Sequence, residues 1–240
     1  MFNTIFKDIK KLLIYSGFAK SEFEVPDYHF KPDFFSTHKK AIDLIKDNSK
    51  VLDIGCNDGA FLKHLKENKN CEIFGIDNDN KEKKITEVIN HNLDDGLPDI
   101  DFTNYDYITM LDVIEHLNKP ESFIKNLKEK IDNNRKTKVI FSTPNIAFLP
   151  LRISLLFGNF NYSSKGILDY THKRLFTFFS FRNMLIENNL KIENVYGIPA
   201  PFPLVISTSA ISSFLLTLNS WLIKINKKLF SFQMVFVVSK

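Results

Sequence analysis

A turn that contains two glycines follows a short apolar run and could cradle a small ligand. Gly55 and Gly59 let the backbone approach a ligand closely, and Asn57 belongs to the few other residue types that accept a positive φ. Amides at the start of a following helix would face a carboxylate, and Asp53 or Asp58 could hold a cationic amine. The alternative is an ordinary strand-to-helix turn that binds no ligand.

A second acid, Asp77, ends the next apolar run. A carboxylate at the tip of a strand can accept two hydrogen bonds from ribose hydroxyls, so the pair of features predicts a nucleoside site. Dinucleotide sites favour G-x-G-x-x-G, whereas the spacing here is G-x-x-x-G, which disfavours a nicotinamide cofactor. An NAD-dependent oxidoreductase remains the alternative enzyme, and capping of the following segment is the structural alternative for Asp77.

A third group of polar residues lies in the stretch Asp169–Thr177, in an expected loop between sheet and helix. His172 could accept a proton from a hydroxyl nucleophile, since its ordinary pKa of about 6.5 suits that work. Arg174 and Arg152 could bind a carboxylate or phosphate. The alternative is a hydrogen-bonded loop that closes over the cofactor.

Short apolar runs alternate with helical patterns from residue 50 onward, which predicts a parallel sheet with crossover helices. The expected strands are Val51–Ile54, Glu72–Ile76, Glu87–Asn90, Tyr107–Leu111, Lys138–Ser142, Lys191–Tyr196 and Gln233–Val238. The expected helices are His38–Lys46, Gly59–Glu67, a short one at Asn80–Ile85, Glu121–Ile131 and Ser180–Glu187.

Residues 1–36 precede this pattern as an amphipathic helix, over residues 1–18, and an extended connection. The helix either packs on the domain or lies, with its lysines, on an anionic membrane surface. We assign residues 37–240 to one domain that carries an apolar insertion at about residues 197–231.

The insertion includes Ile198–Ile223, which contains no charged residue. Three prolines near its start and many serines and threonines argue against a membrane-spanning helix. A packed or substrate-side insertion is the favoured interpretation, and an interfacial contact with a membrane is the alternative.

The composition fits one globular domain: 240 residues, 44% hydrophobic and 25% charged. The net charge is only +4 and four of the 32 basic residues are arginines, so we expect no nucleic-acid partner. Two cysteines cannot build a disulfide framework, and the first residues lack the apolar core of a signal peptide. We expect a cytoplasmic protein, with the inner face of the membrane as the alternative location.

The chain resembles the class I S-adenosylmethionine-dependent methyltransferases, with the likeness closest to the MetW-like branch and to methyltransferases of bacterial surface-polysaccharide clusters. The likeness covers about residues 45–200. It is carried by the stretches Val51–Gly59, Phe74–Asp77, Asp106–Leu117 and Val139–Asn145. It implies a doubly wound, mostly parallel, seven-stranded Rossmann-like α/β sheet with a C-terminal antiparallel strand.

By this resemblance the glycine turn holds the methionine part of S-adenosylmethionine and Asp77 holds its ribose. Asn92 stands where many members carry an acid for the adenine amino group, and an amide oxygen can still accept that bond. The predicted cofactor-binding residues are Asp53, Gly55, Cys56, Asn57, Gly59, Asp77, Asn78, Asn92, Leu93, Leu111 and Asp112. The predicted catalytic residues are His172, His116 and Arg174.

Asp112, Glu115 and His116 have the spacing i, i+3, i+4, which predicts one helical face near the cofactor end of the sheet. The segment is similar to the E-x-x-E-H of ubiquinone-pathway O-methyltransferases, where these residues can bind a divalent metal. Three roles stay open: a metal site, a lining of the cofactor or substrate pocket, or a structural helix start. We favour the lining and assign no metal ligand.

The resemblance implies methyl transfer, an in-line displacement that depends mainly on positioning, with a base needed only for a hydroxyl or an acidic carbon. We expect O-methylation of a hydroxyl or carboxyl on a small-molecule, sugar or lipid-linked acceptor, and polysaccharide biosynthesis as its context. The non-enzymatic alternative is a degenerate methyltransferase fold that acts as a membrane-associated binding subunit.

Overall fold

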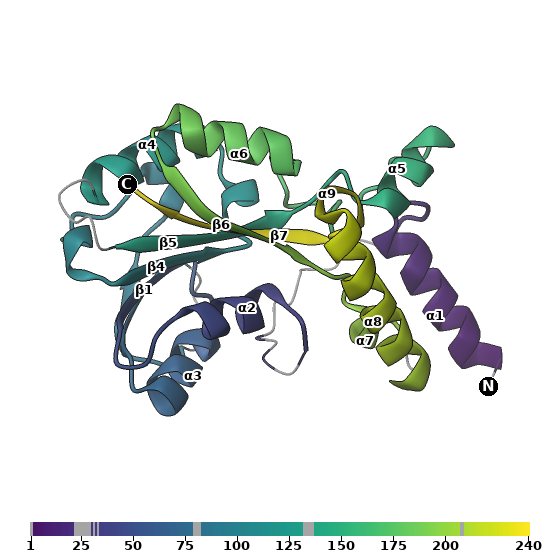
Figure 1. The fold of residues 1–240 in the computed structure, drawn as a ribbon, viewed down its shortest axis with the longest axis horizontal. Helices are drawn as coiled ribbons and strands as arrows, with labels where there is room; N and C mark the ends of the chain where they lie inside the picture. Colours follow the sequence, from purple (N-terminus) through teal and green to yellow (C-terminus); the bar gives the residue numbers. More distant parts are fainter. Residues whose placement is uncertain are drawn as a thin grey trace.

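The computed structural model describes residues 2–21, 30, 32, 34–78, 83–131, 137–206 and 209–240. Its centre is a seven-stranded sheet with strand order β3-β2-β1-β4-β5-β7-β6 and helices on both faces (Figure 1). The strands are β1 (Lys50–Ile54), β2 (Glu72–Asp77), β3 (Val88–Asn90), β4 (Tyr107–Leu111), β5 (Lys138–Pro144), β6 (Lys191–Ile198) and β7 (Gln233–Ser239). Each coincides with a predicted strand to within two residues at either end, so the α/β fold class is confirmed.

The order of the strands reverses at β1, which pairs in parallel with β2 on one side and with β4 on the other. Because the chain leaves β1 toward β2 and later returns to β4, the carboxyl ends of these strands border a crevice where α/β proteins bind ligands. At the far edge β7 lies between β5 and β6 and runs antiparallel to both. The predicted C-terminal antiparallel strand is therefore confirmed.

The helices cover the two faces of the sheet as separate layers (Figure 1). The α-helices are α1 (Phe2–Tyr15), α2 (Thr37–Leu44), α3 (Ala60–Lys69), α4 (Pro120–Ile131), α5 (Leu149–Leu156), α6 (Phe178–Glu187), α7 (Phe202–Val205), α8 (Ser209–Ile225) and α9 (Lys227–Phe230). Apolar residues of α4 and α6 pack on one face, and those of α2 and α3 pack on the other. This doubly wound arrangement buries the apolar strands on both sides.

One predicted helix is not found in the described residues, and the helix α5 was not predicted. The short helix expected at Asn80–Ile85 is absent from its described part, where residues 84–86 form a bend, and its other residues lie outside the described chain. The helix α5 follows β5 without having been predicted. The pattern of α5 is apolar nearly all round, with four leucines and isoleucines that remain exposed or partly exposed, and therefore lacks the clear amphipathic period of a packed helix.

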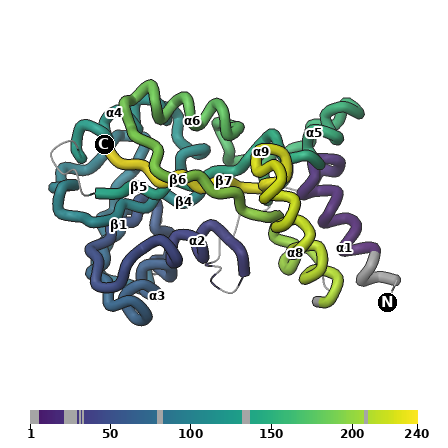
Figure 2. The backbone as a smooth tube through the Cα atoms, viewed as in Figure 1, coloured from purple at the N-terminus to yellow at the C-terminus, as the bar shows by residue number. Residues whose placement is uncertain are grey.

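The apolar insertion folds as α7, α8 and α9 between β6 and β7. Among the described residues, no helix has the length and apolar character that crossing a membrane requires. The helices α1, α5 and α8 gather at the end of the sheet toward which β4 and β5 run (Figures 1 and 2). The C-terminal end of α1 packs on the domain through Tyr15, whose ring lies 6.0 Å from that of Phe232. Part of the predicted connection, residues 22–29, 31 and 33, lies outside the described chain.

Candidate active site

The first glycine turn has the backbone conformation that its residues predict. Gly55, Asn57 and Gly59 all have positive φ, at 79°, 49° and 78°. A Cβ on Gly55 would lie 2.4 Å from the side chain of Val113, and one on Gly59 would lie 2.7 Å from Ile85. The glycines are therefore required by close packing within the protein as well as by the shape of the turn.

Asp77 and Asn57 are joined directly. The Asn57 amide donates a 2.7 Å hydrogen bond to Oδ2 of Asp77, which places the acid at the tip of β2 beside the glycine turn. Lys83 lies on the same acid, with Nζ 3.5 Å from Oδ1 of Asp77 and 2.6 Å from the Asn57 carbonyl oxygen. A ribose that hydrogen-bonds to Asp77 must share the carboxylate with this ammonium group or displace it.

Asp53 is a buried carboxylate at the base of the turn, with only 4% of its surface exposed. It accepts a 2.6 Å hydrogen bond from the Thr109 hydroxyl on β4. Burial, with a smaller contribution from the negative charge of Asp77, raises the pKa of Asp53 to about 7. Burial also raises the pKa of the neighbouring Cys56 thiol, which is therefore neutral and unreactive. Two carboxylates close together at this edge make it receptive to a cationic ligand.

The remaining predicted cofactor residues surround the same edge. Asn78 follows the strand β2 and is exposed, and Leu111 is the last residue of β4. Asn92 caps the short helix Leu93–Asp95, since its side-chain oxygen accepts a hydrogen bond from the Asp94 amide. Contact of Asn92 with an adenine stays a prediction. The Asn92 side-chain oxygen would then accept hydrogen bonds from both the adenine amino group and the Asp94 amide.

Asp112 does not stand on a helical face with Glu115 and His116, so that prediction is wrong. It has a φ of 56° at the end of β4, and only residues 114–116 form a short 3-10 helix. Its carboxylate accepts hydrogen bonds from Ser142, Thr37 and Gln233 at 2.8, 3.2 and 2.7 Å. These bonds fix Asp112 between the cofactor edge and the cavity described next.

A cavity of about 120 Å³ lies at the carboxyl ends of β4 and β5. Its polar lining consists mainly of Ser36, Thr37, His38, Asp112, Glu115, His116, Lys165, Asp169, His172 and Gln233. Its apolar lining includes Tyr15, Phe34, Phe35, Pro144, Pro199, Pro201 and Phe232. Of the predicted cofactor residues only Asp112 lines it, so the cavity adjoins the nucleoside site and does not coincide with it.

The two predicted catalytic histidines meet in this cavity. Their rings are 4.8 Å apart, centroid to centroid, in an edge-to-face arrangement. Nδ1 of His172 donates to the Ile167 carbonyl oxygen at 2.8 Å, and Nδ1 of His116 donates to that of Thr171 at 3.2 Å. A carbonyl can only accept, so each neutral ring carries its lone pair on Nε2. Burial lowers the pKa of both rings, which favours this neutral form.

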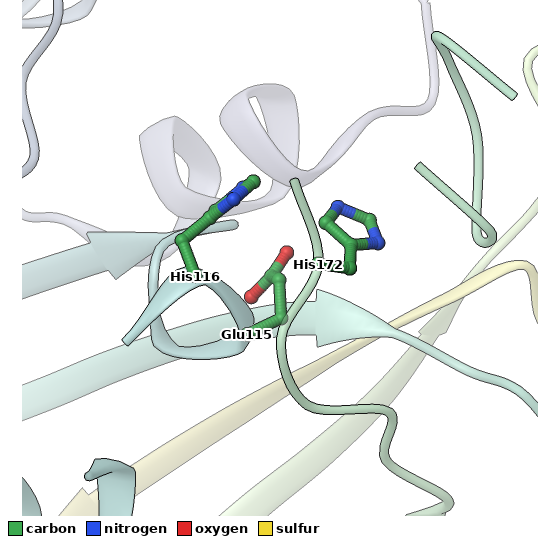
Figure 3. A group of neighbouring side chains, drawn as sticks. All are labelled: Glu115, His116 and His172. Carbon is green, nitrogen blue, oxygen red and sulfur yellow. The ribbon is translucent and has the colours of Figure 1, made fainter. Parts of the chain in front are cut away.

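Glu115 joins the histidines, as the pocket lining favoured in the sequence analysis predicts, although it was not among the predicted catalytic or cofactor-binding residues. Its backbone carbonyl accepts hydrogen bonds from the amides of Lys173 and Arg174, which ties the 3-10 turn to the His172 loop. Its carboxylate lies between the two imidazoles (Figure 3). Only 1% of the residue is exposed, and burial, then the charge of Asp112, raises the pKa of the carboxyl well above its ordinary value.

The two candidate arginines lie outside this cavity. The Arg174 guanidinium pairs with the Glu121 carboxylate of α4 at 3.0 Å, and about half of its side chain is exposed. Arg152 donates from Nε to the Ala147 carbonyl oxygen at 2.6 Å. A catalytic role for Arg174 has no support from its position, whereas surface pairing explains it.

Several residues that shape the site escaped the sequence analysis. Tyr15 and Gln233 come from the two ends of the chain and meet in the cavity, and no local pattern marks either of them. Thr109 could be found, because it is a polar residue in an apolar run that pairs in register with Asp53 on β1. Lys83 follows the acid of β2 by a few residues, and only its contact with Asp77 gives it significance.

The residues at the crevice fit S-adenosylmethionine. The buried Asp53 accepts a hydrogen bond from the Thr109 hydroxyl, and no cationic side chain of the described residues pairs with it. The methionine amine or sulfonium would supply a positive charge nearby. Asp77 is aligned by a backbone amide at the position that suits ribose hydroxyls. The positive-φ turn between them leaves amides at its surface rather than side chains.

Comparison with known proteins decides between the enzyme classes. A family profile described as "Methyltransferase domain" matches residues 29–195, well over half of the chain. The chain belongs to the methyltransferase-domain family. This membership confirms the predicted methyltransferase family, and together with the shared fold it favours a methyltransferase over a nicotinamide oxidoreductase.

Solved methyltransferases share the fold at low sequence identity. An S-adenosylmethionine-dependent methyltransferase from Mesorhizobium loti has a TM-score of 0.55 and 12% identity, over 85% of this chain and 98% of its own. A phosphoethanolamine N-methyltransferase 2 of Haemonchus contortus, solved with S-adenosyl-L-methionine, has a TM-score of 0.50 and 12% identity, over 99% of this chain and 58% of its own.

A curated relative is similar over a shorter stretch. The (S)-tetrahydroprotoberberine N-methyltransferase of Eschscholzia californica is 31% identical over 93 residues, which are 35% of this methyltransferase-family chain and 27% of the relative. The chain thus spans about a quarter of the length of the curated relatives that it matches.

Proposed function

We propose that this chain transfers the methyl group of S-adenosylmethionine to a hydroxyl or carboxyl oxygen of an acceptor in the cavity beside the nucleoside site. The observation that carries the proposal is the position of that cavity. It begins at Asp112, on the cofactor edge of β4, and it contains two histidines that each hold a lone pair on Nε2. An acceptor there would lie next to the methyl donor.

When bound, S-adenosylmethionine supplies an electrophilic methyl carbon, which the acceptor oxygen attacks as the carbon–sulfur bond breaks and S-adenosylhomocysteine forms. The glycine turn and Asp77 would fix the donor, and the cavity walls would fix the acceptor in line with it. For a hydroxyl acceptor, Nε2 of His172 would take the proton. The Ile167 carbonyl holds the ring in the tautomer that this transfer needs.

N-methylation is a second candidate, and specific observations favour it. The curated relative is an N-methyltransferase, and three carboxylates line the cavity, those of Asp112, Glu115 and Asp169. Carboxylates attract a protonated amine, and a neutral amine attacks a methyl carbon without a base. The two candidates differ in the atom that receives the methyl group.

The surface around the cavity supports a lipid-linked acceptor. Large apolar side chains are exposed on α1, at the end of α5 and along α8, the helices that gather at this end of the molecule (Figure 1). They are Phe6, Ile9 and Leu13 of α1, Leu155 and Leu156 of α5 with Phe157 directly after it, and Ile211, Phe214, Leu218, Trp221 and Ile225 of α8. The α8 residues recur at helical spacing and form one stripe.

The charges of this surface fit an anionic membrane. Every charged residue between positions 197 and 231 is a lysine, and on α1 the only acid, Asp8, is buried. Lysines beside exposed apolar side chains are typical of segments that lie in the headgroup region of an anionic bilayer. We therefore propose peripheral contact with the inner face of a membrane, where a lipid-linked sugar of surface-polysaccharide synthesis would be the acceptor. We propose no nucleic-acid partner.

The reaction is tested with S-adenosylmethionine that carries a deuterated methyl group. The protein is incubated with separate lipid, sugar and amine fractions of a bacterial extract, and the products are analysed by mass spectrometry. The proposal predicts a label on oxygen, as an ether or ester, in the lipid or sugar fraction. A label on nitrogen would establish the second candidate. Cofactor binding without labelling of any fraction would instead support a degenerate binding subunit.

A further inference from the structure

Three potential metal ligands converge on one point of the cavity. One ligand atom each of Glu115, His116 and His172 lies within 4.8 Å of the other two (Figure 3). The set differs from the pattern that the sequence suggested. Asp112 is withdrawn by its three hydrogen bonds, and His172 arrives from a separate loop.

The Glu115 carboxylate gives the first independent indication of a cation-binding site. Both of its oxygens are buried and have no hydrogen-bond partner in good geometry within the described part of the chain, although the Thr143 hydroxyl, which also lacks such a partner, lies near them. Buried polar atoms without partners are rare because they cost free energy. A proton or a bound cation would neutralise the carboxylate and lower this cost. Two backbone hydrogen bonds, from the amides of Lys173 and Arg174 to the Glu115 carbonyl oxygen, hold this residue against the His172 loop.

The two histidines give the second sign. Each Nδ1–H is bound to a backbone carbonyl, that of Ile167 or Thr171, which fixes the ring and places its lone pair on Nε2. Metal-binding histidines in proteins are oriented in this way by their second nitrogen.

The surrounding charges favour a cation. The carboxylates of Asp112 and Asp169 face the same cavity as the three ligands, and Asp112 and Asp169 both act electrostatically on Glu115. Lys165 also lines the cavity, and its positive charge partly offsets the negative charge of these carboxylates. The acids outnumber it, so a divalent ion would lower the electrostatic cost of the cluster.

We propose that Glu115, His116 and His172 bind one divalent transition-metal ion, of the zinc or iron(II) type, on the wall of the acceptor cavity. Two imidazoles and one carboxylate suit these ions, whereas magnesium and calcium prefer oxygen ligands alone. At metal–ligand distances of about 2.0–2.2 Å, neighbouring ligand atoms are about 3.3 Å apart. The present separations of up to 4.8 Å therefore close by small side-chain rotations when the ion binds.

The open positions of the ion would face the cavity, where an acceptor oxygen could coordinate and lose its proton more readily. With the ion bound, the histidines would act as ligands. The ion would then promote loss of the acceptor proton, the role that His172 has as a base in the metal-free site. Metal binding itself does not depend on the proposed reaction, and it can be measured without an acceptor or a methyl donor.

The test is calorimetric titration of the chelator-treated full chain with Zn²⁺, Mn²⁺ and Mg²⁺, followed by the visible spectrum of the Co²⁺ form. We expect one equivalent of Zn²⁺ to bind and Mg²⁺ to bind far more weakly. In Glu115→Gln and His172→Gln, which keep the size of the side chain, we expect the affinity to fall about 100-fold or more. The matched control, His64→Ala on α3, should bind like the wild type.

Circular dichroism of each variant verifies its fold before titration. The absence of stoichiometric binding to the wild type would overturn the proposal. Binding that Glu115→Gln and His172→Gln leave unchanged would also overturn it, since the ion would then be held by other groups. Failure of methyl transfer with intact metal binding would contradict the proposed reaction and leave the metal site established.

Discussion

The Asn57 amide donates a 2.7 Å hydrogen bond to the Asp77 carboxylate and so joins the first glycine turn to the end of the second strand. Asn57 can point its amide there because its backbone adopts a φ of 49° between two positive-φ glycines. The two parts of the nucleoside site, far apart in the sequence, are thereby fixed to each other.

Gly55→Ala should destabilise the fold by about 2–4 kcal/mol, since it adds backbone strain and overpacking. The new Cβ would lie 2.4 Å from Val113, at a φ of 79°. Urea unfolding measures the change. Gly158→Ala is the matched control, because Gly158 has a φ of 74° and open space around it, and it should cost about 1 kcal/mol.

Trimming Val113 to alanine in the Gly55→Ala background should recover the part of the loss that comes from overpacking. The backbone strain would remain. Equal destabilisation by Gly55→Ala and Gly158→Ala would show that the Val113 contact does not matter, contrary to the geometry.

Asp53 should make the stability depend on pH. Its pKa is raised from 3.8 to about 7 in the folded chain, so the unfolded chain loses this proton first as the pH rises. The free energy of unfolding should therefore fall between about pH 4 and pH 7 and become level above that range, by an amount on the order of a few kcal/mol.

Asp53→Asn lacks the titrating group but can still accept the Thr109 hydrogen bond. Its free energy of unfolding should exceed that of the wild type increasingly toward neutral pH, as measured by urea unfolding across this range. The difference between the two free energies of unfolding cancels the contributions of Glu115 and the two histidines, which both proteins share. A constant difference between the curves would show that Asp53 titrates at its ordinary pKa.

His172→Ala should slow methyl transfer about 100-fold or more with the acceptor that the labelling experiment identifies. Affinity for S-adenosylhomocysteine should stay unchanged, because His172 lines the acceptor cavity and not the nucleoside site. Arg174→Ala should keep nearly full turnover, since this arginine pairs with Glu121 outside the cavity. Full turnover in His172→Ala would exclude His172 from catalysis.

Replacing Phe6 and Ile9 of α1 by serine should release the protein from anionic vesicles. Both side chains are at least half exposed and stand beside lysines. Co-sedimentation with phosphatidylglycerol vesicles measures the binding, and phosphatidylcholine vesicles should bind less. The control Phe179→Ser removes an equally exposed ring from α6, on another side of the molecule, and should bind like the wild type. Unchanged sedimentation of the double variant would contradict the membrane proposal.

The sheet could be predicted from the sequence because each strand is a short apolar run, such as Tyr107–Leu111, buried on both faces. The backbone geometry of the proposed nucleoside site could be predicted for a related reason, since a strand and its following turn are continuous in the chain. The positive φ of Asn57 and the strand-tip position of Asp77 both follow from local residues.

The cavity could not be predicted in the same way, because it assembles distant segments. Glu115 is joined to the His172 loop by backbone hydrogen bonds, and Tyr15 and Gln233 line the cavity from opposite ends of the chain. The helical spacing of Asp112 and His116 was misleading, because Asp112 adopts a left-handed conformation that ends the periodicity. Sequence spacing indicates a shared face only where a regular helix continues.

Calorimetric titration with S-adenosylhomocysteine, on the wild type and on Asp77→Ala, tests the central claim most directly. We predict binding of one equivalent to the wild type and an affinity at least about 10-fold lower for Asp77→Ala, which loses a charged hydrogen-bond acceptor. Asp99→Ala, which removes an exposed acid elsewhere, should bind like the wild type. No binding to the wild type, or equal binding to the wild type and Asp77→Ala, would contradict the assignment of the nucleoside site.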